Sequence, residues 1–325
     1  MFTRRTVLSC LVVAALGSAV WLAGCSEAKD PWEGKPSPHV LVTIPPLYSF
    51  AKSVAGDHGA VICLCTETGP HHYETSTTDL RALRGATVFF TVGLGLDDKF
   101  TDRMVNTIPE KKDARVELGE KLPAALKLKP REEHDEKDAK HGHEHEGDFD
   151  PHVWLGTPQA IKMVELIRDE LKKADKDHAK DYDQNAEAYI KELKELHDEG
   201  VKMLKGDKKR IISFHDSLEY FAKEFDIEIV DVIEKGPGQE PGSKEMRELV
   251  DKCVKDDVRI IAVEPQYPRT SAAATILAEL KKKGKTDVAL VEIDPLETAK
   301  ANELSADWYV KKMRQNLKNL SEKLP

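Results

Sequence analysis

The longest helical pattern in the chain, residues 178–205, has the sequence HAKDYDQNAEAYIKELKELHDEGVKMLK. Its apolar side chains recur at alternating steps of four and three residues, at Tyr182, Ala186, Tyr189, Leu193 and Leu196. This spacing puts them in one stripe on an otherwise charged helix. At 1.5 Å per residue the helix would be roughly 40 Å long. We therefore expect it to run along two lobes and to join them.

Short strand-like runs alternate with helical runs on both sides of this helix, for example at 39–44 before it and at 210–214 after it. Alternation of this kind predicts parallel β-α-β units. We therefore predict an α/β fold with two lobes joined by the long helix. The expected parts are a first lobe over 39–177, the linking helix over 178–205 and a second lobe over 206–325.

The composition limits the classes of protein to which this chain can belong. The 325 residues include 49 Lys and Arg and 58 Asp and Glu, for a formal net charge of -9. This acidic balance argues against nucleic acid as a partner, because phosphate binding requires a basic face. Low overall hydropathy excludes a polytopic membrane protein, and only the first 24 residues could meet a bilayer.

The N-terminus has the pattern of an export signal. In residues 1–24, Arg4 and Arg5 precede an apolar stretch that is too short to span a membrane comfortably. The stretch ends in Leu-Ala-Gly before Cys25, which resembles the lipobox of bacterial lipoproteins. We predict removal of 1–24, lipidation of Cys25 and a proline-containing tether over 25–38, with the mature protein outside the cytoplasm on a membrane surface. The two arginines also fit a weak twin-arginine signal, so the export route and the leaflet that holds the anchor stay open.

Three histidines, His71, His152 and His215, each stand at an ordered turn or at the end of an expected strand, and Asp294 offers a carboxylate at a similar turn. Ligands of α/β sheets bind beyond the carboxyl ends of the strands, so groups from both lobes could converge between them. Three imidazoles and a carboxylate suit a borderline divalent cation, above all zinc, in a near-tetrahedral site. Spacing alone does not establish convergence, because a single histidine at a strand end is more often a capping or surface residue.

Six segments, in this order, resemble those of the zinc/manganese solute-binding lipoproteins of bacterial ABC importers. They are PHHYE at 70–74, DPHVWL at 150–155, FHDSLEYF at 214–221, VEPQ at 263–266, EIDPL at 292–296 and WYVKKMRQNL at 308–317. The resemblance extends from about residue 39 to residue 324. It implies two Rossmann-like lobes, a long rigid linking helix and a metal held in the cleft between the lobes.

The resemblance also implies a ligand set. Carried over position by position, the ligands fall on His71, His152, His215 and Asp294. Manganese-type members usually carry Glu at the third place, so His215 favours zinc. Thr75 and Glu297 depart from the family pattern, which often has Pro and Gly there. We expect these two departures to change local loop shape more than metal binding.

Residues 130–148 are almost entirely charged and cannot bury a core, so we expect a mobile loop. Zinc-type members of the family commonly carry a histidine-rich loop before the second ligand, which implies low-affinity zinc capture or sensing here. Binding in the loop would be weak, since ordering it costs conformational entropy. The alternative is a solvated insert with no metal role. The loop histidines are His134, His141, His143 and His145.

Three acidic residues are candidates for supporting roles. Asp216 and Glu264 could hold ligand imidazoles by their second nitrogen, or form structural ion pairs. Glu74 could be an alternative ligand or a gate, although a surface or supporting position is the more common one for such a residue.

The cysteines of the mature chain carry a weaker signal. Cys63 and Cys65 would face the same side of a strand, where they could form a thiol metal site or act as small apolar fillers. The filler interpretation is favoured because no other cysteine is near in sequence. The role of Cys253 stays open.

These observations predict a zinc-binding protein that captures zinc outside the cytoplasm and delivers it to an ABC permease. We expect a monomer with a lipid anchor and without enzymatic activity. Alternatives on the same scaffold are a manganese-specific binding protein or a metal-binding surface adhesin. A zinc hydrolase is less favoured, because His-Glu-x-x-His is missing and four protein ligands would close the metal site.

Overall fold

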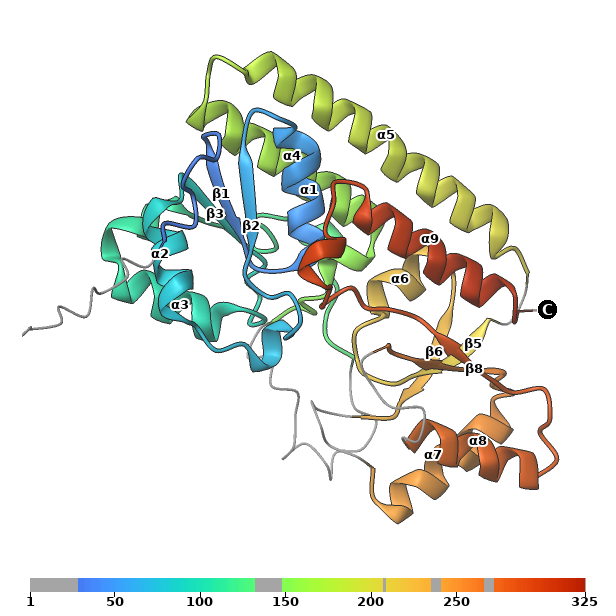
Figure 1. The fold of residues 1–325 in the computed structure, drawn as a ribbon. Coiled ribbons are helices and arrows are strands. Elements are labelled where there is room, and N and C mark those ends of the chain that lie inside the picture. Colours follow the sequence, from blue (N-terminus) through green and yellow to red (C-terminus); the bar gives the residue numbers. More distant parts are fainter. Residues whose placement is uncertain (1–28, 132–147, 207–208, 235–240, 266–271, 325) are drawn as a thin grey trace, which may run out of the picture.

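The computed structural model describes residues 29–131, 148–206, 209–234, 241–265 and 272–324. These residues form two α/β lobes, each built on a four-stranded parallel sheet (Figure 1). Figure 1 shows the first lobe at the left, with the second lobe below and to the right of it. The predicted fold class is confirmed.

The first sheet has the strand order β2-β1-β3-β4. Its strands are β1 (His39–Val42), β2 (Ala60–Cys63), β3 (Val88–Thr91) and β4 (Arg115–Glu117). The central strand β3, VFFT, is buried along its whole length, as is typical of a parallel sheet with helices on both faces. The helices of this lobe are α1 (Pro45–Ala55), α2 (Thr77–Gly85), α3 (Asp98–Thr107) and α4 (Thr157–Ala174).

The second sheet repeats this topology in the order β6-β5-β7-β8. Its strands are β5 (Arg210–Ser213), β6 (Glu228–Val232), β7 (Ile260–Val263) and β8 (Ala289–Glu292). Its helices are α6 (Glu219–Glu224), α7 (Ser243–Lys255), α8 (Ala272–Lys282) and α9 (Trp308–Ser321). In both sheets the first strand along the chain lies inside the sheet, so the polypeptide crosses over near the middle, which is where α/β proteins place ligands.

The helix α5 (Ala179–Met203) lies within the range predicted for the linking helix. Its buried residues include all five members of the apolar stripe. Figure 1 shows α5 running past both lobes, with α4 and α1 beside its first half and α9 beside its second half. The Asn185 amide also donates a hydrogen bond of 3.0 Å to the Val54 carbonyl of α1.

The two lobes share one hydrophobic core. A single cluster of buried residues includes Val40 and Phe50 of the first lobe, Leu193 of α5, and Phe221 and Ile293 of the second lobe. A separate, smaller cluster lies in the second lobe, between its sheet and the helices α7 and α8. The interface between the lobes is therefore core-like, not a thin hinge.

The end of the predicted tether packs on the first lobe. Trp32 is only 2% exposed, and its indole nitrogen donates a hydrogen bond of 2.8 Å to the Ala82 carbonyl. Its ring also stacks on His39 at 4.6 Å. The fold thus begins before residue 39, the expected start of the first lobe. None of the helices in the described ranges is long and apolar enough to cross a bilayer.

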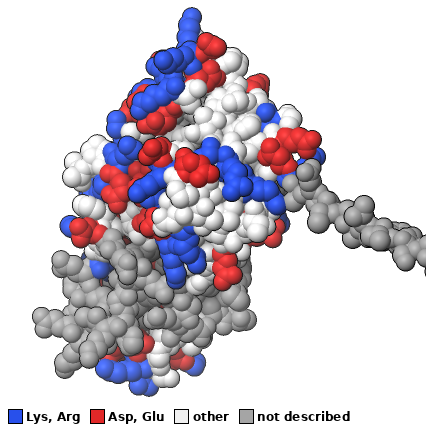
Figure 2. Space-filling model, turned by 90° about the vertical axis from the view of Figure 1, so that its left-hand side faces the viewer, with Lys and Arg blue, Asp and Glu red and all other residues white. Residues whose placement is uncertain are grey.

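Acidic and basic side chains are interspersed on the face that Figure 2 turns toward the viewer. Elsewhere on the described surface, opposite charges form ion pairs, such as Lys311 with Asp307 and Lys282 with Glu279, each at 2.6 Å. Exposed pairs of this kind contribute little to stability, typically about 0–1 kcal/mol. The mixed pattern means that the described part of this face carries charge of both signs.

Candidate metal centre

Four side chains from both lobes meet at the junction of the lobes. One nitrogen or carboxylate oxygen from each lies within 4.8 Å of those of the other three, and three of the four residues are buried. The residues are His71, His152, His215 and Glu297. Three of the four ligands predicted from the sequence are thus brought together, and the fourth member of the cluster is a different acid.

Each histidine is placed by a turn that follows regular structure. His71 lies in the short 3-10 turn Pro70–His72, and His152 immediately precedes the 3-10 turn Val153–Leu155. His215 stands two residues after the end of β5. The three rings lie close together, with centroid separations of 6.2 Å (His71–His152), 5.6 Å (His71–His215) and 5.3 Å (His152–His215).

The spacing of the donor atoms fits a small tetrahedral ion. Glu297 Oε1 lies 3.6 Å from His71 Nε2 and 3.4 Å from His152 Nε2. Bonds of about 2.0–2.1 Å in a tetrahedral zinc site place the ligand atoms about 3.3–3.4 Å apart. The two separations from Glu297 are therefore close to those that one shared zinc ion would require.

Asp150 holds the imidazole of His152 in one orientation. One carboxylate oxygen, Oδ1, lies 2.8 Å from His152 Nδ1 and accepts the backbone N–H of the same residue at 2.9 Å. With Nδ1–H donating to Asp150, Nε2 is the nitrogen that faces the cluster. Burial lowers the pKa of His152, but Asp150 and Glu297 outweigh burial and raise it to about 10.

Glu264 has the corresponding position beside His215. Its Oε1 lies 3.4 Å from His215 Nδ1, and the carboxylate is buried. Burial lowers the pKa of His215, but Glu264 and Glu297 outweigh it and raise the pKa overall. Of the two acids predicted to support ligand imidazoles, Glu264 is thus placed against a ring. Asp216 follows His215 in the chain and is partly exposed.

The buried carboxylate of Glu297 is the negative centre of the cluster. Burial raises the pKa of Glu297, but the three surrounding histidines outweigh burial and hold the pKa well below its ordinary value. The residue is therefore a carboxylate at neutral pH, which is the form that binds a metal.

Asp294, the acid predicted as the fourth ligand, is directed elsewhere. Its Oδ1 accepts the backbone N–H of Leu296 at 2.8 Å, and its Oδ2 lies 3.1 Å from Lys312 Nζ. Its own backbone N–H donates to Asn316 at 2.9 Å. The structure therefore differs from the expected arrangement in two respects. Asp294 shapes the turn, and Glu297, expected to change loop shape more than metal binding, faces the histidines.

The family follows from residues 40–323, which match the family described as "Zinc-uptake complex component A periplasmic". The chain belongs to this zinc-uptake family. The predicted resemblance to zinc-type solute-binding proteins is confirmed.

Relatives in this family carry zinc in their names. The zinc-binding lipoprotein AdcA of Streptococcus pneumoniae R6 is 31% identical over 320 residues, which are 96% of this chain and 60% of AdcA. The chain thus spans about three fifths of that relative. The high-affinity zinc uptake system protein ZnuA of Bacillus subtilis is 28% identical over 322 residues, which are 96% of both chains.

Solved structures of similar chains share this fold. The Zn(II)-bound ZnuA-like domain of Streptococcus pneumoniae AdcA has a TM-score of 0.67 and 26% identity, covering 87% of this chain and 97% of that domain. The solute-binding protein FpvC of Pseudomonas aeruginosa, in complex with Mn2+, has a TM-score of 0.72 and 26% identity, with the same coverage. Similar chains are therefore recorded with zinc and with manganese.

The remaining predicted residues lie apart from the cluster or outside the described ranges. Glu74 is exposed and is not among the four grouped residues. Cys25 and the four loop histidines lie outside the described residues, so their predicted roles remain predictions. These histidines are His134, His141, His143 and His145.

The three cysteines of the described chain are free thiols, each at least half-buried. Cys63 Sγ donates to the Thr43 carbonyl at 3.7 Å and to the Cys65 carbonyl at 3.3 Å. Cys253 belongs to the apolar cluster of the second lobe. Burial raises the pKa of all three thiols, which disfavours the thiolate form that binds metals. These contacts fit the interpretation as apolar fillers.

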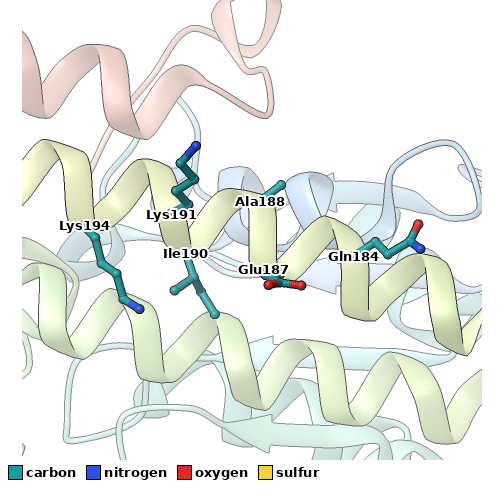
Figure 3. A pocket seen from close by; sticks show the side chains of 6 residues that line it. All are labelled: Gln184, Glu187, Ala188, Ile190, Lys191 and Lys194. Carbon is teal, nitrogen blue, oxygen red and sulfur yellow. The ribbon is translucent and has the colours of Figure 1, made fainter.

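A surface hollow lies along α5, away from the metal cluster (Figure 3). All the residues that line it belong to that one helix: Gln184, Glu187, Ala188, Ile190, Lys191 and Lys194. It is the flank of a helix, with no histidine or cysteine in its lining.

Proposed function

We propose that this protein captures zinc outside the cytoplasm and passes it to the permease of an ABC importer. The observation that carries the proposal is the cluster of three imidazoles and one buried carboxylate at the junction of the lobes. Membership of a family described as a periplasmic zinc-uptake component supports the same function.

The donor set favours zinc over manganese and calcium. Imidazole nitrogens suit zinc, whereas manganese and calcium favour sites made mostly of oxygen donors. His71, His152, His215 and Glu297 would hold the ion, with Asp150 and Glu264 fixing the orientation of two rings. The supporting acids add negative charge close to the cation.

Four protein ligands also favour binding over catalysis. A catalytic zinc keeps one position open for water, whereas a tetrahedral shell filled by protein side chains has none. The proposed cycle therefore consists of capture and release, and zinc is the cargo. We further propose that lipid on Cys25 keeps a monomeric protein near its permease, as the lipobox-like sequence suggests.

Metal content after purification in the absence of chelators and added metals tests the proposal. We expect about one zinc per chain by elemental analysis, and strong zinc binding by competition with a chelator. A chain with the His-rich residues 132–147 deleted should retain this site, because the cluster lies outside that segment. A preference for manganese under the same conditions would favour the manganese alternative.

The variant His215→Ala supplies the second arm of this test. We expect its zinc affinity to fall by at least about a hundredfold, because one of four buried ligands is lost. His39→Ala is a matched control, since His39 is not one of the four grouped residues and stacks on Trp32. Unchanged affinity in His215→Ala would contradict the proposed site.

A further inference from the structure

The segment that carries His152 is hydrogen-bonded to the second lobe, although it precedes the linking helix in the chain. We call residues 150–157 the His152 segment. Two residues of α6 hold its ends. Tyr220 Oη donates to the Asp150 carbonyl at 2.8 Å. At the other end, the Glu224 carboxylate accepts the backbone N–H of Thr157 at 2.7 Å and also the Thr157 hydroxyl.

The middle of the His152 segment is held in the same way. The indole nitrogen of Trp154 donates to the Pro295 carbonyl at 2.8 Å, in the turn that leads to Glu297. The Tyr309 hydroxyl of α9 donates to the Trp154 carbonyl at 2.6 Å. His152 is thus fixed to the same body that carries His215 and Glu297.

Opening the lobes as rigid bodies would break the shared core. The cluster of buried apolar residues is continuous from the first lobe through α5 and α9 into the second lobe. Exposing apolar surface costs about 25 cal/mol per Å², so a wide separation of the lobes is strongly opposed. Exchange of a bound ion must therefore use a smaller movement.

The segment that carries His71, residues 66–76, is positioned differently. Two of its backbone hydrogen bonds lie within the segment itself. They run from His72 N to Gly69 O at 3.3 Å and from Tyr73 N to Pro70 O at 3.5 Å. It meets the second lobe through the bond from Ala299 N to Thr66 O at 2.9 Å. We call it the His71 segment.

The His71 segment is also the solvent side of the site. Five of its 11 residues, at positions 67, 68, 72, 74 and 76, are exposed, and of the other six only Pro70 is fully buried. Gly69 packs against the second lobe, because a Cβ at this position would lie 3.5 Å from Glu297 Oε2 and 3.5 Å from Thr298 Cγ2. The segment therefore covers the carboxylate from the outside.

We propose that His152, His215 and Glu297 form a preassembled three-ligand half-site, and that His71 is the exchangeable fourth ligand. Metal enters and leaves when the His71 segment moves away from Glu297, while the lobes keep their relative position. During exchange, water takes the fourth place on the ion, as in zinc sites with three protein ligands. This inference rests on the proposed function and specifies how the same site loads and empties.

A reversible lock tests the inference in the full mature chain. The double variant Gly69→Cys/Thr298→Cys places two thiols across the contact between the His71 segment and the second lobe. A Cβ at position 69 would lie 3.5 Å from Thr298 Cγ2, which is bonded to Thr298 Cβ, so the two positions are close enough for a disulfide to be attempted. Zinc is loaded first, the disulfide is formed, and dissociation into excess chelator is timed. We expect at least tenfold slower dissociation when oxidised, and recovery after reduction with a phosphine. Equal rates in the cross-linked and reduced forms would overturn the inference.

The single variants Gly69→Cys and Thr298→Cys are the matched controls, because neither can form this cross-link. Should the double variant fail to fold or cross-link, hydrogen exchange of the unmodified chain gives a second readout. Zinc should protect amides of the His71 segment much more than those of the His152 segment. Equal protection of both segments would overturn the inference. Lack of zinc binding by the unmodified chain would instead refute the proposed function, so the two failures are distinguishable.

Discussion

Asp294 and Glu297 stand three residues apart, and the turn between them decides which one faces the histidines. Asp294 accepts the N–H of Leu296, two residues on, which is the hydrogen bond of an Asx turn. Leu296 has φ of 65°, in the left-handed region that non-glycine residues seldom adopt. The chain reverses there and brings Glu297 to the cluster.

Substitution of these two acids should have unequal effects on zinc affinity. Glu297→Gln keeps the shape but removes the charged ligand, so we expect affinity to fall by at least about a hundredfold. Asp294→Asn retains an oxygen that can accept the N–H of Leu296, and we expect a loss of no more than about tenfold. Chelator competition measures both. A greater loss in Asp294→Asn would favour the ligand set predicted from the sequence.

Zinc binding should release protons, because two of the histidines have raised pKa values in the metal-free protein. His152, with a pKa of about 10, is protonated at neutral pH, and zinc binds only the neutral ring. Affinity should therefore rise with pH between about 6.5 and 10, by up to roughly tenfold per unit for each proton released. Calorimetry in buffers with different ionisation enthalpies counts these protons.

Asp150→Asn is the matched variant for this measurement. Without the Asp150 charge the pKa of His152 should fall, so fewer protons should be released on binding. A proton count of zero in the unmodified chain would contradict the assigned protonation.

At the scale of elements, the first lobe depends on a buried aspartate at the start of α3. Asp97 accepts the Thr43 hydroxyl at 2.6 Å and the backbone N–H groups of Val92 and Gly93, each at 2.8 Å. It therefore joins the end of β1, the turn after β3 and the first turn of α3. Burial raises the pKa of Asp97 to about 6, although these three donors oppose that shift.

Asp97→Ala should lower the free energy of unfolding by about 3–5 kcal/mol, because buried donors lose their acceptor. Asp98→Ala is the control. Asp98 accepts the Gly95 N–H at 2.7 Å from a less buried position, and we expect a loss of about 1 kcal/mol. Urea unfolding monitored by circular dichroism measures both. Equal losses would show that Asp97 does not have this joining role.

At the scale of the whole molecule, we expect the two lobes to fold as one unit, because they share a hydrophobic core. The cluster that contains Val40, Leu193 and Ile293 is continuous through both lobes, although the second lobe also has a smaller cluster of its own. The linking helix α5 is part of this core and not a free connector.

We therefore expect a single cooperative unfolding transition by calorimetry, shifted upward by zinc because the metal binds the folded state. X-ray scattering should give the same radius of gyration with and without zinc. Two separated transitions, or a clear contraction on zinc binding, would contradict a shared rigid core.

The sequence by itself predicted both lobes, because the period of the apolar residues differs between strands and helices and is local. The stripe from Tyr182 to Leu196 likewise predicted α5 within two residues at each end. The three histidines were found through motifs that are also local. Their convergence was only an expectation, since it depends on contacts between segments far apart in the chain.

Only the tertiary structure decided between Asp294 and Glu297. Both acids follow β8, and the choice depends on Lys312 and Asn316 of α9, which bind Asp294 and turn it away from the histidines. The sequence likewise did not predict that the His152 segment is hydrogen-bonded to the second lobe. Its hydrogen bonds join residues that are separated by between 67 and 155 positions in the chain. A pattern within a short stretch of sequence cannot predict such a bond.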